Sequence, residues 1–128
     1  MSTRSRIAIE NQNGSVTSIY CHFDGYISGV GKLLKEYYTT QAKVEALIEL
    51  GDISALGMTP SSTIAYHRNR EEDLHKTSYL CVEDLFDLGF EGGVEYVYCF
   101  TKNNIWLVNE VGSNQVNDLK VAFEEEGA

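Results

Sequence analysis

The sequence predicts a single α+β domain over residues 1–128, in which an antiparallel sheet built from N- and C-terminal hairpins is packed by two central helices and a short C-terminal helix. Three observations predict this class. Alternating apolar runs flank residues 11–14, a second pair flanks residues 101–104, and apolar residues at helical spacing fill the segment 30–50. A chain of 128 residues is long enough to bury a core of its own.

The N-terminal hairpin is expected from residues 6–10 and 15–20, because Asn-Gly between two alternating apolar runs is a strong turn signal. Alternate residues of the second run face opposite sides of the strand, and Tyr20 and His22 share one side. Both sides are fairly apolar, so the sequence leaves open which face of the sheet is buried.

Apolar residues spaced three and four apart predict one helix face from Val30 to Tyr38 and a second helix over residues 41–50. Thr40 is placed to cap the second helix, and Gly51 is placed to end it in a left-handed conformation. The remaining elements are expected, in order, at residues 63–67 (a short strand), 67–76 (an exposed polar segment), 83–88 (a helical turn), 96–100 and 105–108 (the second hairpin) and 117–126 (a short acidic helix).

Composition excludes some functions and leaves others open. A formal net charge of −9 disfavours direct contact with nucleic-acid backbones. No segment is apolar over the length of a membrane span and the N-terminus lacks a secretory signal, so we expect no membrane contact. An acidic surface suits a basic partner, and it also serves solubility alone. The three cysteines lie in apolar runs without a CxxC pair, so we expect reduced thiols and no cofactor.

The strongest candidate for a site is the stretch 18–34, in which an alternating strand runs into a loop containing three glycines and then into a helix. Tyr20, His22 and Asp24 share one face of the strand at the point where it enters the loop. Loops that follow strand ends are common places for sites. We therefore expect a phenol, an imidazole and a carboxylate to lie together there.

Residues 28–32, Ser-Gly-Val-Gly-Lys, resemble the end of a phosphate-binding P-loop. Leu33 stands where that motif needs a serine or threonine for Mg²⁺, and the chain lacks the alternating βαβ pattern, so an NTPase is not expected. Two interpretations remain open. The amides of residues 29–31 bind an anion at a helix N-terminus, or the glycines serve only to allow the turn.

The second candidate is the segment 66–70, Tyr-His-Arg-Asn-Arg, which with the nearby His75 and Lys76 forms the main basic cluster of an acidic chain. Arginine forks bind phosphate or carboxylate groups in bidentate fashion. The same arginines also stand beside the acidic residues 71–73 and are able to pair with them on a solvated loop. The sequence leaves both interpretations open.

Two catalytic or metal-binding arrangements are not expected. Cys21 and His22 are adjacent on a strand, so their side chains point to opposite faces and do not meet as a nucleophile and its base. His22 and Asp24 with a distant histidine lack the spacing of a metal site. We therefore expect neither a catalytic residue nor a metal ligand.

Segments along nearly the whole chain resemble a widespread family of small phage and prophage proteins. In that family a hairpin ends in His-Trp-Asp-Gly-Tyr-Pro followed by Gly-Val-Gly, where this chain has His-Phe-Asp-Gly-Tyr-Ile at residues 22–27. The family's Tyr-His-Arg-Asp-Arg-Gly-Glu corresponds to residues 66–72. This chain departs from the pattern at Phe23, Ile27, Asn69 and Glu71; losing the proline leaves the loop less rigid, and the last two changes make a tight turn at 68–71 less favourable.

The family carries no assigned activity, so the resemblance implies an origin rather than a mechanism. Small phage proteins often counter host defence, and by that analogy we expect an anti-defence protein in the host cytoplasm. The leading expectation is a non-catalytic protein that sequesters a small phosphate-bearing ligand, such as a nucleotide signal. The expected ligand-binding residues are Tyr20, His22, Asp24, Tyr26, Gly29, Gly31, Lys32, Tyr66, His67, Arg68 and Arg70.

Two alternatives are retained. The first is an acidic inhibitor of the anti-CRISPR kind, which blocks a nucleic-acid-binding host defence protein; it ranks second because the acidic residues are spread over most of the chain. The second is a nucleotide-acting enzyme that uses His22 or His67 as its acid or base, with Asp24 orienting the imidazole. Assembly as a homo-oligomer is left open.

Overall fold

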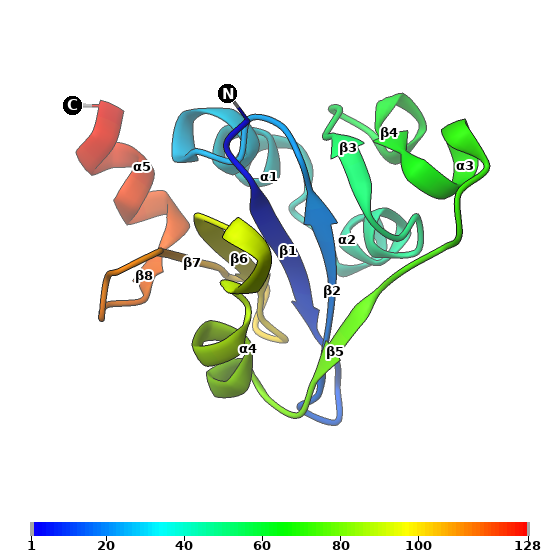
Figure 1. Cartoon of the computed structure of the whole chain (residues 1–128). Coiled ribbons are helices and arrows are strands. Elements are labelled where there is room, and N and C mark those ends of the chain that lie inside the picture. Colours follow the sequence, from blue (N-terminus) through cyan, green and yellow to red (C-terminus); the bar gives the residue numbers. More distant parts are fainter. Residues whose placement is uncertain (1, 128) are drawn as a thin grey trace.

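The computed structural model describes residues 2–127, which build one sheet with helices on both of its faces (Figure 1). The strands are β1 (Ser5–Glu10), β2 (Val16–Cys21), β3 (Ile53–Ala55), β4 (Ile64–Ala65), β5 (Thr77–Tyr79), β6 (Tyr96–Phe100), β7 (Trp106–Glu110) and β8 (Asn117–Asp118). The helices are a π-helical turn η1 (Ile27–Gly31) that continues into α1 (Lys32–Tyr37), then α2 (Gln41–Ile48), α3 (Tyr66–Arg70), α4 (Val82–Leu88) and α5 (Leu119–Gly127), with short 3-10 turns η2 (Pro60–Ser62) and η3 (Glu91–Gly93).

The sheet order is β4-β3-β2-β1-β6-β7-β8, with β5 paired to β2 beside β3. The α+β class predicted from the sequence is confirmed, and the hairpins β1–β2 and β6–β7 are antiparallel as expected. The two hairpins meet through a parallel pairing of β1 with β6, in which Ile7 lies opposite Tyr98. The sheet is therefore mixed rather than antiparallel throughout, because the long connection between the hairpins brings the chain back in the same direction.

Both hairpins close with the same kind of turn. The amide of Gly14 donates to the carbonyl of Asn11, and the amide of Asn104 donates to the carbonyl of Thr101 in the same way. Gly14 and Asn104 have φ angles of 89° and 63°, so each occupies the left-handed position. Glycine and asparagine tolerate that conformation best, which explains why these sequences predict their turns correctly.

Two apolar clusters cover the two faces of the sheet. The larger cluster packs α1, α2 and α5 against one face and includes the fully buried Ile7, Leu34 and Leu47. The smaller cluster packs α4 against the other face through Leu85 and Val97. Both faces of β2 are therefore covered, and the larger core lies on the side of Ile19 and Cys21.

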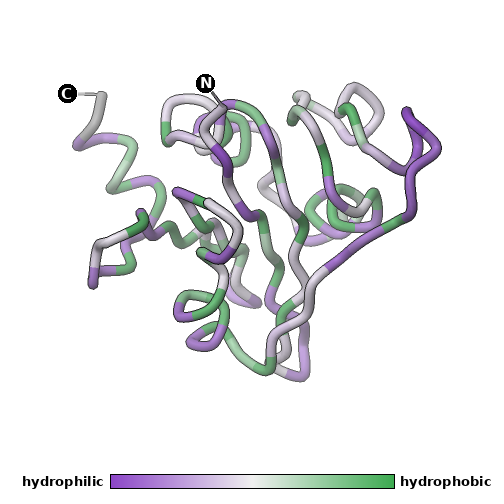
Figure 2. Tube along the Cα trace, viewed as in Figure 1, coloured by the Kyte–Doolittle hydropathy of each residue, from purple (hydrophilic) through white to green (hydrophobic). Residues whose placement is uncertain are grey.

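The predicted helix ends are also found in the structure. The Thr40 hydroxyl accepts from the amide of Lys43 at the start of α2, and Gly51 follows that helix with a φ of 75°. The segment from α3 to β5 is mostly hydrophilic apart from Leu74 (Figure 2), and residues 67–75 are all exposed. None of the described helices is long and apolar enough to cross a membrane.

Candidate functional site

The predicted strand-end residues form two separate contacts. The Nδ1 atom of His22 lies 2.8 Å from the hydroxyl of Tyr20, and its Nε2 atom lies 3.1 Å from the hydroxyl of Ser2. Asp24 instead accepts a 3.3 Å hydrogen bond from the Tyr26 hydroxyl, and its φ of 59° turns the chain out of the strand direction. The partners of His22 are thus two hydroxyls, and the carboxylate expected to orient it contacts Tyr26.

The amides of the glycine-containing loop are used inside the protein. Gly29 and Gly31 donate to the carbonyl of Tyr26 at 3.0 and 3.4 Å, and Val30 donates to the carbonyl of Asp24 at 2.8 Å. A Cβ atom on Gly29 would overlap the carbonyl oxygen of Asp24. This geometry supports the interpretation in which the glycines allow a close turn, whereas anion binding would need amides that point outward.

The basic side chains of α3 are held by their own surroundings. The guanidinium of Arg68 donates to the carbonyls of Pro60, Ser61 and Thr63, all of which lie in or next to the η2 turn. Arg70 lies 5.3 Å from the centre of the Tyr66 ring. Arg68 therefore holds α3 against the η2 turn. Few N–H donors of its guanidinium remain available for an external phosphate. His67 donates from Nδ1 to the carbonyl of Glu72 at 2.8 Å.

Asp52 joins the two predicted segments, and sequence reasoning missed it. One carboxylate oxygen accepts from the amide of Tyr20 at 2.9 Å and the other lies 2.9 Å from Nδ1 of His75, while its backbone carbonyl accepts from the amide of Tyr66 at 3.2 Å. Burial raises the pKa of Tyr20. Tyr20, His22 and Tyr66 are thus linked at one end of the sheet.

The hollow beside Tyr66 is acidic rather than basic. It has a volume of about 530 Å³ and is lined by Asp52, Tyr66, Glu71, Glu72, Asp73 and His75. None of His22, Asp24, Tyr26, Arg68 or Arg70 lines it, so the expected single phosphate pocket is not formed around this hollow. In the sheet, β3 and β4 lie between β2 and the start of α3. The residues at the end of β2 and the arginines of α3 therefore do not line one common pocket.

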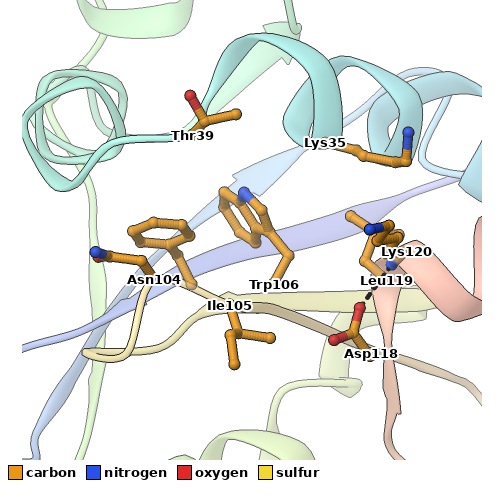
Figure 3. Close-up of a pocket in the computed structure, with 9 residues that line it drawn as sticks. Lys35, Thr39, Asn104, Ile105, Trp106, Asp118, Leu119 and Lys120 are labelled. Carbon is orange, nitrogen blue, oxygen red and sulfur yellow. Dashed lines mark hydrogen bonds between the residues drawn. The ribbon is translucent and has the colours of Figure 1, made fainter.

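A different pocket lies between α1, the start of β7 and the start of α5 (Figure 3). It has a volume of about 240 Å³. Its lining residues are Lys35, Thr39, Phe100, Asn104, Ile105, Trp106, Asp118, Leu119 and Lys120, a set that we call the Trp106 pocket.

The inner wall of the Trp106 pocket is aromatic and fixed in place. The rings of Phe100 and Trp106 have centroids 5.1 Å apart and are tilted by 54°. The indole N–H of Trp106 donates to the carbonyl of Tyr38 at 2.8 Å, which anchors the ring to the end of α1. Because the N–H is already bonded, the indole offers the pocket its apolar surface.

Two lysines line the Trp106 pocket, and they come from two different helices. Lys35 extends from α1 and its ammonium lies 4.9 Å from the centre of the Phe123 ring, while Lys120 lies in the first turn of α5 (Figure 3). The carboxylate of Asp118 accepts from the amide of Lys120 at 2.8 Å and thereby fixes the start of α5. The rim therefore combines two positive charges with a carboxylate already engaged by the backbone.

Sequence reasoning missed this pocket because its residues come from segments far apart in the chain. Lys35 and Lys120 each read as ordinary solvated helix residues, and Phe100 and Trp106 as strand core. The one available signal is that Trp106 is the sole tryptophan and begins a strand directly after an exposed turn.

Comparison with protein-family models, with curated proteins and with solved structures gave no match. Among residues 2–127, no group of three or more histidine, cysteine, aspartate or glutamate side chains is arranged to hold a metal ion. Cys21, Cys81 and Cys99 are free thiols, and burial raises the pKa of Cys21 and Cys99 to about 12.

Proposed function

We propose that the protein binds a small molecule with a flat ring and an anionic group, a description that fits a nucleotide, and that the Trp106 pocket is the binding site. The observation that carries this proposal is the pairing of an aromatic wall, Phe100 and Trp106, with two ammonium groups, Lys35 and Lys120. A ring buried against aromatic side chains gains apolar contact, and each charge-assisted hydrogen bond adds about 1.5–3 kcal/mol.

The size of the pocket limits the ligand. A volume of about 240 Å³ lies below the usual range of roughly 300–1,000 Å³ for small-molecule sites. One ring fits inside, and the anionic group stays at the rim beside Lys35 and Lys120. The lining carboxylate, Asp118, already accepts from the backbone amide of Lys120, and we propose ligand capture without catalysis for this pocket. Capture of a host nucleotide signal by a phage protein is the biological role that we propose for it.

Binding of AMP tests the proposal, with adenosine as the uncharged control. Trp106 is the sole tryptophan, so its fluorescence reports occupancy directly. We expect Lys35→Ala with Lys120→Ala to weaken AMP binding by about 10- to 100-fold or more while adenosine binding changes little. The matched control is Lys32→Ala with Lys43→Ala, which removes two helix lysines that do not line the pocket.

Arg68 and Arg70, which the sequence predicted as ligand-binding residues, provide the result that would contradict this proposal. If Arg68→Ala with Arg70→Ala abolishes AMP binding while the Lys35 and Lys120 variant binds normally, the Trp106 pocket is not the site. If AMP does not alter Trp106 fluorescence in the wild type or in the variants, the proposal fails as a whole. Mass spectrometry of small molecules released from protein purified out of defence-active cells then identifies the natural ligand.

A second candidate function rests on the acidic hollow beside α3. Asp52, Glu71, Glu72 and Asp73 surround about 530 Å³, enough for basic side chains of a partner protein. An inhibitor of a nucleic-acid-binding host protein would use this surface. Glu71→Lys with Glu72→Lys should then abolish anti-defence activity and leave AMP binding intact, whereas unchanged activity would remove this candidate.

A further inference from the structure

A chain of three polar side chains lies at the end of β2 and shares no residue with the Trp106 pocket. The Ser2 hydroxyl lies 3.1 Å from Nε2 of His22, and Nδ1 of the same imidazole lies 2.8 Å from the hydroxyl of Tyr20. A hydroxyl within reach of an imidazole whose other nitrogen is held by a third group is the arrangement of an activated nucleophile.

The surroundings hold the imidazole in one orientation. The Phe23 ring packs against it in a T-shaped arrangement, at a centroid distance of 4.6 Å and an interplanar angle of 82°. When Nδ1–H donates to the oxygen of Tyr20, the lone pair of Nε2 faces the hydroxyl of Ser2 and is able to accept its proton. Burial raises the pKa of Tyr20, which keeps its hydroxyl neutral as the partner of His22.

Ser2 and His22 are only partly buried, so a small substrate can reach them.

We propose that Ser2 is an acyl-accepting nucleophile and that this site hydrolyses small carboxylic esters with a good leaving group. His22 acts as the general base and acid, and Tyr20 is the positioning residue for the imidazole. The proposal is independent of ligand binding in the Trp106 pocket.

The reaction proceeds in two balanced halves. The Ser2 oxygen bonds to the carbonyl carbon while its proton passes to Nε2 of His22; the bond from carbon to the leaving oxygen then breaks, and Nε2 returns the proton to that oxygen. A water molecule next attacks the acyl group on Ser2 and gives one proton to Nε2. When the carbon–oxygen bond to Ser2 breaks, that proton moves to the serine oxygen, which releases the acid and restores the site.

The test mixes the full chain with p-nitrophenyl acetate and follows the release of p-nitrophenolate. We expect a burst of one equivalent per chain, with one acetyl group found on Ser2 by peptide mass spectrometry. Ser2→Ala should remove both the burst and the adduct, and His22→Asn should lower the acylation rate constant by roughly 100-fold or more. The matched controls are Ser28→Ala and His67→Asn, which change an exposed serine and an exposed histidine elsewhere.

Tyr20→Phe separates positioning from a structural role. It removes only the hydroxyl, so we expect the acylation rate constant to fall by about 10-fold or more with an unchanged KM and an unchanged melting temperature. The proposal is overturned if Ser2→Ala reacts as fast as the wild type, or if the acetyl group is found on lysines and no burst occurs. A loss of rate in Ser28→Ala equal to that in Ser2→Ala would also overturn it.

Discussion

The indole N–H of Trp106 donates a 2.8 Å hydrogen bond to the backbone carbonyl of Tyr38. This bond joins the first residue of β7 to the residue that ends α1, and both residues are buried. It therefore holds the aromatic wall of the Trp106 pocket against the loop that leads into α2. The bond stabilises the fold and shapes the proposed site at the same time.

Trp106→Phe removes this bond and keeps an aromatic ring. We expect the free energy of unfolding to fall by about 1–3 kcal/mol, because the buried carbonyl of Tyr38 loses its donor. Urea unfolding followed by circular dichroism measures the loss. Tyr37→Phe, at the neighbouring exposed position, is the control and should change stability by less than about 0.5 kcal/mol. Equal stability of Trp106→Phe and wild type would show that the bond contributes nothing.

Glu71 ends α3 with a φ of 55°, a left-handed conformation that an acidic side chain adopts at a cost. Glycine adopts it without that cost, although it loses more backbone entropy on folding. We expect Glu71→Gly to raise the free energy of unfolding by up to about 1 kcal/mol. Glu72→Gly, one residue further along, lacks the positive φ and should be neutral or destabilising; a larger gain there than at residue 71 would contradict the explanation.

Gly29 is required by the close turn before α1, because a Cβ atom there would overlap the carbonyl of Asp24. We expect Gly29→Ala to destabilise the protein by roughly 1–3 kcal/mol, with nucleotide binding retained in the fraction that remains folded. Ser28→Ala, at the adjacent exposed residue, is the control. A variant that melts like the wild type but no longer binds AMP would show instead that this loop holds the ligand.

Burial raises the pKa of Cys21 and of Cys99 from 9.0 to about 12. At neutral pH and below, both thiols are protonated in the folded and the unfolded chain, so they add no pH dependence there. Between the two pKa values the unfolded chain releases protons that the folded chain keeps. The free energy of unfolding should then decrease as pH rises, by up to about 1.4 kcal/mol per pH unit and thiol.

Urea unfolding of the wild type and of Cys99→Ala above pH 9 measures this contribution. Other groups titrate equally in both proteins, so the difference between their slopes belongs to Cys99. We expect the variant, although less stable, to lose stability more slowly as pH rises. Identical slopes would mean that the Cys99 thiol ionises as readily in the folded protein as in the unfolded chain.

The parts of the fold that depend on neighbouring residues were predictable from the sequence. Gly14, Thr40 and Gly51 carry turn and cap signals, and each takes the predicted role. The parallel pairing of β1 with β6 was not predictable, since each strand shows only its own alternation and no residue announces its distant partner. The β8 pairing to β7 was missed for the same reason, because two residues are too few to show a period.

The candidate site was less predictable than the fold. Tyr20 and His22 contact each other at the strand end, whereas Asp24, which was expected beside them, contacts Tyr26. Asp52, which was not predicted, links Tyr20 to Tyr66. The sequence predicted Arg68 as a phosphate ligand, whereas in the structure its guanidinium donates to backbone carbonyls of η2. Backbone carbonyls carry no sequence signature, so these acceptors could not be predicted. The Trp106 pocket depends on the meeting of α1, β7 and α5, which only the tertiary structure brings about.

The parallel pairing of β1 with β6 also determines when the sheet can be completed during synthesis. Ile7 and Ile9 leave the ribosome well before Tyr98 and Phe100, which belong to the strand that covers this edge of β1. Until Tyr98 and Phe100 emerge, the N-terminal hairpin carries an open edge with apolar residues beside it, the kind of surface that pairs with other chains. We therefore expect a chain cleaved before β6 to keep this edge of β1 open to pairing with other chains.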